Sequence, residues 1–565
     1  MKKILLILSL FISLNVVGQG EAANWYFGEN AGMQFDLATG NTTPLNGGQL
    51  NTREGCSTIS DANGNLLFYS DGITVWNRNH QVMPNGNGLF GDPSSTQSAL
   101  VVPKPEDPDI YYIFTIDVRF GAQLNGFNFS VIDMSLDGGL GDVIDKNMPL
   151  LSSSSEKISA VLKDCVKKSI WVITFASLNG DTNIYNTFHA FEVNNSGVNT
   201  TAVISTFNTN INDARGYLKL SPDGTKLVNA NMSGGLFLYD FDENTGVVTN
   251  EQQLIINSQS NAPYGVEFSP NSQILYVHSS NDSGGAAINH SSVLTQFNLA
   301  IADIQASEFE LDGRQLYRGG LQLGPNGKIY RALSATYTQG LPFLGVINNP
   351  NNIGAAANYQ HDAISLSPNL SSQGFPPFIQ SIFNTEIDII RNGLSVTNLL
   401  LCDGDTYMLI ADDIVGATYS WTLDGNPLAE IGTDLVVTQA GVYQIFIDPN
   451  NGDCAIEGEA TVSYFTPPIA NQPANINVCD DDNDSFFMFD FTVDVDVQVL
   501  GAQDPSTFSV HYFESQIDAD SNINEIVMPY QNLTNSQEMF ARINNDGFID
   551  CFDTTSFFIE IFDTP

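Results

Sequence analysis

The chain has 565 residues, with 63 acidic side chains against 20 basic ones and a formal net charge of −43 at pH 7. So negative a surface repels nucleic-acid phosphates and anionic lipid head groups, and we exclude both as partners. Hydrophobic residues make up 42% of the chain and charged residues 15%, which predicts folded, turn-rich domains rather than disorder.

The N-terminus has the features of an export signal. Lys2 and Lys3 precede an apolar run at residues 4–17, and small or polar residues follow it. A charged start, a short apolar core and a small-residue cleavage zone define a secretory signal peptide. The apolar run is shorter than the about 20 residues that span a bilayer, and no later segment of the sequence is apolar for long enough. We therefore predict a signal peptide at residues 1–19 and a secreted or cell-surface protein without a transmembrane segment.

Residues 20–384 show the pattern of an all-β domain. Short apolar runs alternate with Gly, Asn, Asp and Pro, and no stretch has sustained helical periodicity. A turn recurs after a short strand at Ser221, Ser269 and Gly324, at intervals close to the about 40–50 residues of a four-stranded propeller blade. Seven such strand starts, the last at 375–379, predict a seven-bladed β-propeller, with six or eight blades as alternatives. The strand at 25–27 is expected to complete the last blade and close the ring.

Two smaller β modules are predicted after the propeller. Residues 385–398 have the composition of a linker, and Trp421 lies in the middle of the next group of strands. Strand and turn patterns predict an Ig-like or PKD-like β-sandwich at 399–467 and a second β-sandwich module at 468–565. The last residues resemble a linker, so we expect the natural protein to continue.

Six cysteines in an exported chain favour disulfides. The predicted pairs are Cys402–Cys454 and Cys479–Cys551, because each pair brackets one module and small sandwiches benefit from a covalent link. Cys56 and Cys165 fall in blades one and three, which do not touch, and a disulfide needs Cα atoms within about 7 Å. We therefore expect these two to be buried free thiols.

Several phrases of this sequence resemble a known group of surface proteins. They are Asn-Trp-Tyr-Phe-Gly at 24–28, Glu-Gly-Cys at 54–56, Leu-Phe-Tyr-Ser-Asp-Gly at 67–72, Gln-Gly-Phe-Pro-Pro-Phe-Ile-Gln at 373–380, and the acidic stretch at 479–484. Together they resemble propeller-containing surface proteins of gliding bacteria, which are type IX secretion substrates with a type B, gliding-motility-associated sorting domain. The resemblance implies a propeller, PKD-like modules and a surface location. The sorting domain is missing from this sequence, so the type IX machinery is an expected partner only of a longer chain.

The residues entering the innermost strands of a propeller lie at one mouth of its central channel, where ligands bind. Alignment of the inner strands on their turns places these residues at one equivalent position: Glu54, Thr96, Lys157, Arg215, Pro263 and Arg318. One hypothesis is an anion- or glycan-binding mouth formed by Lys157, Arg215 and Arg318, with Glu54 as counter-charge and Tyr264 as stacking surface. The alternative is that these charges pair across the rim and hold the ring closed.

An acidic loop in the last module is a candidate calcium site. Asp480, Asp482 and Asp484 alternate along the chain, as in loops that offer successive oxygens to Ca²⁺, which takes 6–8 ligands. Ser485 stands where an EF-hand would have Gly, so the full motif is absent. The alternative is a solvated acidic turn.

Sequence motifs for catalysis are missing. The sequence contains no Gly-x-Ser-x-Gly elbow and no His-Glu-x-x-His motif, and its six histidines are scattered. We therefore expect a non-enzymatic adhesion or recognition protein whose propeller mouth binds a glycan or a protein. The alternatives are a propeller hydrolase, lactonase-like or glycan-active, with its site in the central channel, and a structural surface stalk.

Overall fold

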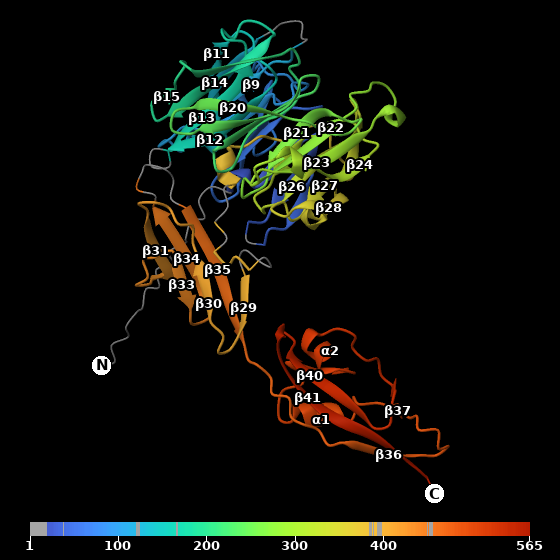
Figure 1. The fold of residues 1–565 in the computed structure, drawn as a ribbon. Coiled ribbons are helices and arrows are strands. Elements are labelled where there is room, and N and C mark those ends of the chain that lie inside the picture. The colour runs from blue at the N-terminus through green and yellow to red at the C-terminus, as the bar shows by residue number, and fades with distance from the viewer. Residues whose placement is uncertain are drawn as a thin grey trace, which may run out of the picture. The chain divides into compact units, whose positions relative to one another are not determined.

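The computed structural model describes residues 20–37, 39–119, 125–164, 168–383, 387, 389–392, 398–448, 450 and 456–564. The chain forms two compact units, one ending at Thr385 and one beginning at Glu386 (Figure 1). The predicted signal peptide lies outside the described residues. No helix in the described ranges is long and apolar enough to cross a membrane.

The first unit is a series of small antiparallel sheets, because its strands are short and most of them turn back to pair with the strand before them. The first sheets contain β1 (Asn24–Phe27), β2 (Ala31–Phe35) and β3 (Thr42–Leu45); β4 (Ser57–Ser60), β5 (Leu66–Ser70), β6 (Thr74–Asn77) and β7 (Val82–Asn87); β8 (Ala99–Pro103), β9 (Ile110–Ile116), β10 (Phe127–Asp133) and β11 (Asp142–Leu151); and β12 (Ile158–Asp164), β13 (Ser169–Ala176), β14 (Tyr185–Asn194), β15 (Gly197–Val198) and β16 (Val203–Ile211). The remaining sheets contain β17 (Leu218–Leu220), β18 (Lys226–Asn231), β19 (Gly235–Asp242) and β20 (Val247–Leu254); β21 (Ala262–Phe268), β22 (Ile274–Ser280), β23 (Ser292–Asn298) and β24 (Phe309–Arg314); and β25 (Leu321–Leu323), β26 (Ile329–Thr336), β27 (Gln339–Ile347) and β28 (Tyr359–Ser365).

These sheets are arranged in a closed ring. The first strand of each sheet contacts the first strand of the next, from β1 through β4, β8, β12, β17 and β21 to β25. The last sheet returns to the first, because the ring centroids of Trp25 and Tyr330 lie 5.5 Å apart and the Asn326 side-chain amide donates to the Gly40 carbonyl at 2.8 Å. The first sheet therefore packs against the last, and the closed ring leaves neither of them exposed on that side.

The predicted seventh inner strand, 375–379, does not form. The Phe375 amide donates to the Tyr217 hydroxyl at 3.2 Å, its ring lies 5.4 Å from that of Trp25, and Ile379 forms a bridge with Ala160. Trp25 lies on β1, Ala160 lies on β12 and Tyr217 directly precedes β17, so the segment contacts three different parts of the ring and occupies its centre. Pro376 and Pro377 explain why this strand is absent, because proline has no amide donor for a sheet ladder. The segment ends in a 3-10 helix, η6 (Gln380–Phe383).

The second unit contains two modules in succession, each with its own apolar core. The first has β29 (Asn398–Cys402), β35 (Ile456–Phe465), β34 (Gly441–Asp448), β31 (Thr418–Leu423) and β32 (Asn426–Pro427) in one sheet, facing β30 (Tyr407–Ile410) and β33 (Asp434–Val437). The second has β36 (Ile476–Asp480), β41 (Phe548–Asp563), β40 (Gln537–Asn545) and β38 (Phe508–Phe513) in one sheet, with β37 (Met488–Phe489), β39 (Tyr530–Gln531), α1 (Val495–Leu500) and α2 (Gln516–Ser521). Trp421 is buried at the centre of the first core and Phe491 in the second. The described part of the chain is thus an all-β protein with two short α-helices.

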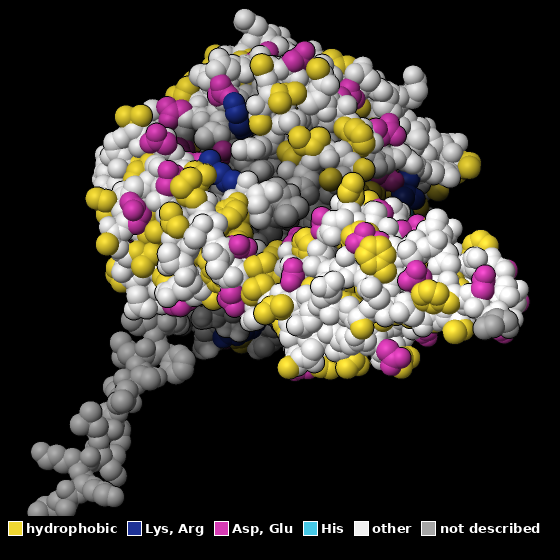
Figure 2. Space-filling model, turned by 60° about the horizontal axis from the view of Figure 1, so that its bottom comes forward, with side chains coloured by type: hydrophobic (Ala, Val, Ile, Leu, Met, Phe, Trp, Pro, Cys, Tyr) yellow, Lys and Arg dark blue, Asp and Glu magenta, His cyan; other side chains and the backbone are white. Residues whose placement is uncertain are grey.

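The surface reflects the acidic composition. Figure 2 shows acidic side chains scattered over the face in view and only a few basic ones among them. Basic side chains are therefore sparse on this face.

Candidate functional site

The segments leading into the first strand of each sheet form what we call the inner rim. Backbone hydrogen bonds join these segments around the ring: Glu54 N to Pro93 O (3.1 Å), Gln97 N to Glu156 O (3.1 Å), Glu156 N to Ala214 O (3.2 Å), Tyr217 N to Tyr264 O (2.8 Å), Gly320 N to Gln373 O (2.7 Å) and Gln373 N to Arg53 O (2.9 Å). The segments at Tyr264 and Gly320 approach each other so closely that a Cβ on Gly265 would lie 2.3 Å from the Gly319 carbonyl oxygen. The sequence alignment therefore located a real structural rim, with Gln373 in its seventh place.

Two buried carboxylates share one hydroxyl at this rim. The Thr96 hydroxyl lies 3.3 Å from Glu54 Oε2 and 3.1 Å from Glu156 Oε2, and both glutamates are only 2% exposed. The Thr96 amide also donates to Glu156 at 3.2 Å. Burial, together with the charge of Glu54, raises the pKa of Glu156 to about 7. Burial also raises the pKa of Glu54, although Arg318 opposes this shift.

Arg318 and Tyr264 lie against the same carboxylates. Arg318 Nη1 is 3.8 Å from Glu54 Oε1, and its guanidinium carbon is 5.4 Å from the centre of the Tyr264 ring. Arg318 is 4% exposed and Tyr264 is fully buried. The structure thus brings together three of the five predicted mouth residues, Glu54, Tyr264 and Arg318, in contacts of the kind expected if the charges pair across the rim.

Lys157 does not face this cluster, and its neighbour Glu156 takes the predicted position. The ammonium group of Lys157 is fully buried, and it donates to the side-chain oxygens of Asn229 and Asn231 and to the Ala230 carbonyl. Burial lowers the pKa of Lys157 to about 7. The register differs by one residue from the alignment, and successive side chains in extended backbone point in opposite directions.

Arg215 lies at the rim but is held by carboxylates of its own. Its Nη2 is 2.7 Å from Asp213 Oδ2 and 3.3 Å from Asp282 Oδ2. Burial of Asp213 favours the neutral acid, but hydrogen bonds from Arg215 and Ser233 hold the pKa of Asp213 below its usual range. Arg215 therefore forms ion pairs with Asp213 and Asp282.

A buried ion pair lies deeper in the ring, and the sequence reasoning missed it. Lys219 Nζ is 2.7 Å from Glu267 Oε2 and 2.5 Å from Gln322 Oε1, and the side chains of the ion pair are 1% and 0% exposed. Each of the three residues stands two positions before the recurring turn in its repeat. Alignment of the repeats on their turns therefore places these three residues at one equivalent position and could have predicted their contact.

A small cleft of about 60 Å³ opens beside the rim. Its lining is rich in hydroxyl and amide groups and comprises Glu29, Asn51, Thr52, Arg53, Ser334, Thr336, Tyr337, Thr338, Gly340, Ser372 and Gln373. Tyr337 forms the tip of the hairpin between β26 and β27. Its ring is 5.0 Å from the Arg53 guanidinium, its hydroxyl is 2.6 Å from Ser94 Oγ, and it is 39% exposed. Tyr337 is thus part of the cleft's lining and contacts two rim segments, at Arg53 and at Ser94.

The buried Glu156 should make the stability of the protein depend on pH. Because its pKa is about 7 in the fold against an ordinary value of 4.5, the folded state keeps a proton that the unfolded chain releases between these values. The free energy of unfolding therefore falls as pH rises across this window, by up to about 3 kcal/mol. We expect Glu156→Gln to flatten the change in Tm between pH 5 and pH 7, measured by thermal denaturation. An unchanged slope in the variant would show that Glu156 ionises normally.

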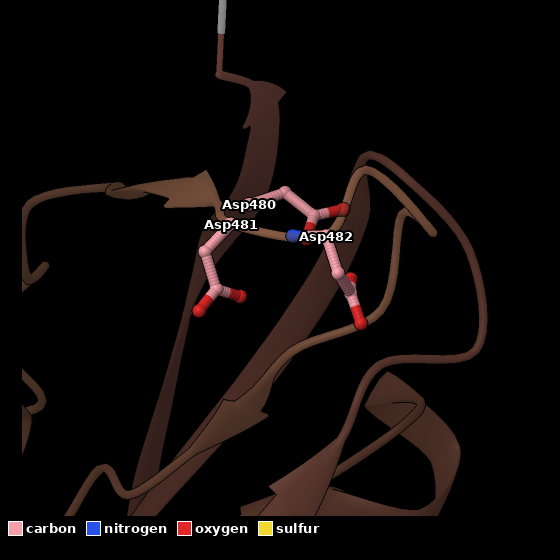
Figure 3. Close-up of side chains that lie close together, drawn as sticks. All are labelled: Asp480, Asp481 and Asp482. Atoms are coloured by element: carbon pink, nitrogen blue, oxygen red, sulfur yellow. The ribbon is translucent and has the colours of Figure 1, made fainter.

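The acidic loop of the last module groups Asp480, Asp481 and Asp482, whose nearest carboxylate oxygens lie within 4.8 Å of one another (Figure 3). Asp484 is not part of this group, and its carboxylate accepts from the Phe486 amide at 2.8 Å. The buried Asp480 accepts from the amides of Ser485 and Asp482 at 2.7 and 3.3 Å. These bonds stabilise the turn itself, and calcium binding at Asp480, Asp482 and Asp484 stays a prediction.

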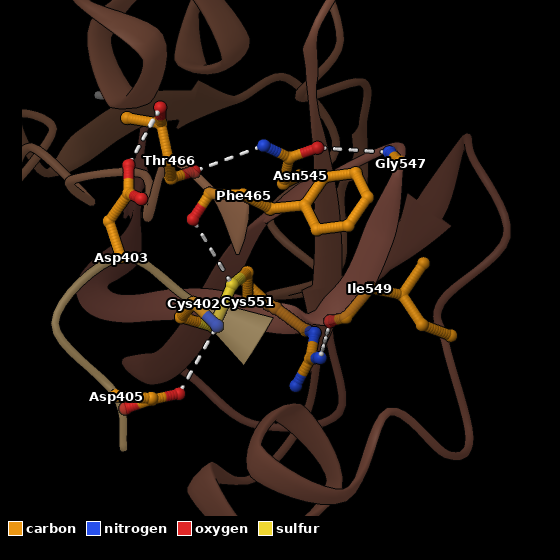
Figure 4. The surroundings of a disulfide bond; sticks show 10 residues. Cys402, Asp403, Asp405, Phe465, Thr466, Asn545, Gly547, Ile549 and Cys551 are labelled. Atoms are coloured by element: carbon orange, nitrogen blue, oxygen red, sulfur yellow. Dashed lines mark hydrogen bonds between the residues drawn. A yellow bond between two sulfur atoms is a disulfide. The ribbon is translucent and has the colours of Figure 1, made fainter. Parts of the chain in front are cut away.

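The disulfide prediction is wrong. Cys402 at the end of β29 is bonded to Cys551 on β41, with Cα atoms 5.6 Å apart (Figure 4), so the bond joins the two modules of the second unit. Cys402 pairs across the sheet with Phe465, the last residue of β35, and therefore lies at the boundary where the next module begins. Cys479 is free and exposed, Cys56 is free and buried as predicted, and Cys165 and Cys454 lie outside the described residues.

Comparisons with solved structures give likenesses at low sequence identity. They include the periplasmic gluconolactonase of Pseudomonas aeruginosa (12% identity, 62% of this chain and 97% of that chain, TM-score 0.38). A putative 6-phosphogluconolactonase from Bacteroides uniformis (12% identity, 78% and 96%, TM-score 0.31) and a gluconolactonase from Xanthomonas campestris (11% identity, 54% and 87%, TM-score 0.28) are further examples. At these TM-scores the likenesses carry no argument about function. No curated protein matches the chain.

One family model matches the C-terminal part of the chain. It is the Flavobacterium inter-domain disulphide bond domain, and it matches residues 475–565. The match contains Cys551, whose partner Cys402 belongs to the preceding module. Disulfides persist in oxidising compartments, which is consistent with an extracellular or periplasmic location. The last module of this protein is therefore similar to a Flavobacterium domain that is described by a disulfide between domains.

Proposed function

We propose that this is a secreted recognition protein of the cell surface, whose first unit is a seven-bladed propeller that binds a glycan in the cleft beside Tyr337. The observation that carries the proposal is the cleft's lining, in which hydroxyl and amide side chains surround an exposed aromatic ring. Sugars present many hydroxyls that need such partners, and a few convergent polar groups set the orientation of a bound ligand. The two modules of the second unit then serve as Ig-like or PKD-like spacers that carry the propeller away from the cell.

The arrangement of the ring's centre supports a binding site at the surface rather than in the channel. The segment at 373–383 occupies the centre through its contacts with Tyr217, Trp25 and Ala160. Glu54 and Glu156 belong to the rim, and their side chains are buried. A ligand approaching from solvent reaches Tyr337 and Arg53 before either carboxylate.

A hydrolase is the second candidate, and one observation favours it. Glu54 and Glu156 share the Thr96 hydroxyl, and the pKa of Glu156 is raised to about 7, in the range of a general acid at neutral pH. Catalysis would require the hairpin tip at Tyr337 to move. Under this alternative, Glu156→Gln abolishes turnover of lactone or glycoside substrates while the cleft still binds its ligand.

The proposed function is tested by a glycan-array screen of the chain from residue 20 to 565. We expect saturable binding that survives a calcium chelator and is lost in Tyr337→Ala, which removes the exposed ring beside the cleft. Phe90→Ala is the matched control, because Phe90 is also 39% exposed and belongs to the same unit. If no glycan binds, the proposal fails, and a protein ligand or a structural stalk becomes the better hypothesis.

A further inference from the structure

Arg53 is an exposed cation in the cleft without a carboxylate partner in the described part of the chain. Its guanidinium packs against the Tyr337 ring at 5.0 Å, and no hydrogen bond or ion pair engages it among the described residues. Other arginines of the same unit, among them Arg215, Arg314 and Arg331, have a carboxylate within ion-pair distance. A guanidinium left open in a cleft is a ready site for an anionic group.

Buried polar atoms next to Arg53 also lack partners. Ser372 Oγ and Gln373 Oε1 are buried without a hydrogen bond in the described structure, and both residues line the cleft. An unsatisfied buried polar group costs about 1–3 kcal/mol, so a ligand hydroxyl that bonds to these atoms would remove that cost. A hydroxyl and an amide oxygen together match the hydroxyl groups of a sugar.

A second guanidinium lies under the same tyrosine. The Arg318 guanidinium carbon is 5.9 Å from the Tyr337 ring, and its Nε and Nη1 have no hydrogen-bond acceptor among the described residues. Arg318 is buried and faces Glu54, so Arg53 is the cation that the cleft lining presents to a ligand. Glu29 also lines the cleft and opposes the binding of densely charged ligands. The balance favours one carboxylate over a phosphate or a sulfate cluster.

We propose that the cleft binds a glycan carrying a uronic acid, with the sugar carboxylate on Arg53 and its hydroxyls on Ser372 and Gln373. This inference rests on the proposed function and specifies its ligand class. A carboxylate matches the guanidinium in geometry and forms charge-assisted hydrogen bonds with it. Because salt screens the attraction between the two charges, we expect the affinity to fall as ionic strength rises.

The test is isothermal titration calorimetry of the chain from residue 20 to 565 with trigalacturonate, with its methyl ester and with acetate. The ester keeps the shape and removes the charge, and acetate offers a carboxylate without a sugar. We expect the ester to bind roughly 10- to 100-fold more weakly than the acid, and acetate not to bind measurably. Arg53→Gln should weaken trigalacturonate binding by a similar factor. Arg78→Gln, an equal change of charge at another exposed arginine of the same unit, should leave the affinity unchanged.

The outcomes separate this inference from the proposed function. Binding of neutral glycans with no preference for the acid, or full affinity in Arg53→Gln, would overturn the uronate assignment and leave glycan recognition standing. Binding of acetate as tight as that of trigalacturonate would also overturn it. Failure of every glycan, acidic and neutral, would refute the proposed function itself.

Discussion

Replacing Glu267 by Gln is expected to lower the free energy of unfolding of the first unit by about 3–5 kcal/mol, because the change leaves the buried Lys219 without its counter-charge. Glu267 Oε2 accepts from both Lys219 Nζ and the Leu323 amide, at 2.7 and 2.9 Å. Burial lowers the pKa of Lys219, and the charge of Glu267 opposes that shift. Without Glu267, the lysine must either lose its proton or carry an uncompensated charge inside the ring.

The measurement is urea denaturation followed by tryptophan fluorescence, since Trp25, Trp76 and Trp171 all lie in the first unit. The double variant Lys219→Met with Glu267→Leu is the control, because replacing both charges by apolar groups of similar volume is often neutral. It should recover most of the loss, although the Leu323 amide still lacks its acceptor. A single variant that loses less than about 1 kcal/mol would mean that the pair is not buried as described.

The rim was predictable because the turns repeat. The turns at Ser221, Ser269 and Gly324 set the register of the inner strands, and this register placed Glu54 and Arg318 at one position, where the structure shows them 3.8 Å apart. The same register aligns Lys219, Glu267 and Gln322, which contact one another. The sequence analysis did not single out these three residues, which the structure buries.

Other features depend on information that a repeat pattern does not contain. Lys157 and Glu156 are neighbours, and an error of one residue in a loop reverses which of them faces the rim. The segment after Gln373 has the composition of a strand, but the prolines at 376 and 377 exclude ladder pairing. The partner of Cys402 depends on how the two modules of the second unit meet. Cysteine spacing alone leaves that connectivity open.

Replacing Cys402 and Cys551 by Ser is expected to destabilise the second unit by about 2–5 kcal/mol, because the bond closes a loop of 149 residues in sequence and thereby restricts the unfolded chain. Without the bond, few contacts join the modules near this point. They include the Asn545 side-chain amide donating to the Thr466 carbonyl at 3.0 Å and the rings of Phe465 and Phe548 at 5.8 Å. We therefore also expect the connecting segment at 466–475 to open to proteases.

Limited proteolysis and thermal denaturation of the chain measure both effects. Cys479→Ser is the matched control, because Cys479 is exposed and unpaired and its removal should change neither the Tm nor the cleavage rate. If the double serine variant resists cleavage as the parent does, the noncovalent contacts alone fix the two modules. Accelerated cleavage confined to 466–475 would instead show that the disulfide is what joins the two β modules rigidly, as the proposed spacer role requires.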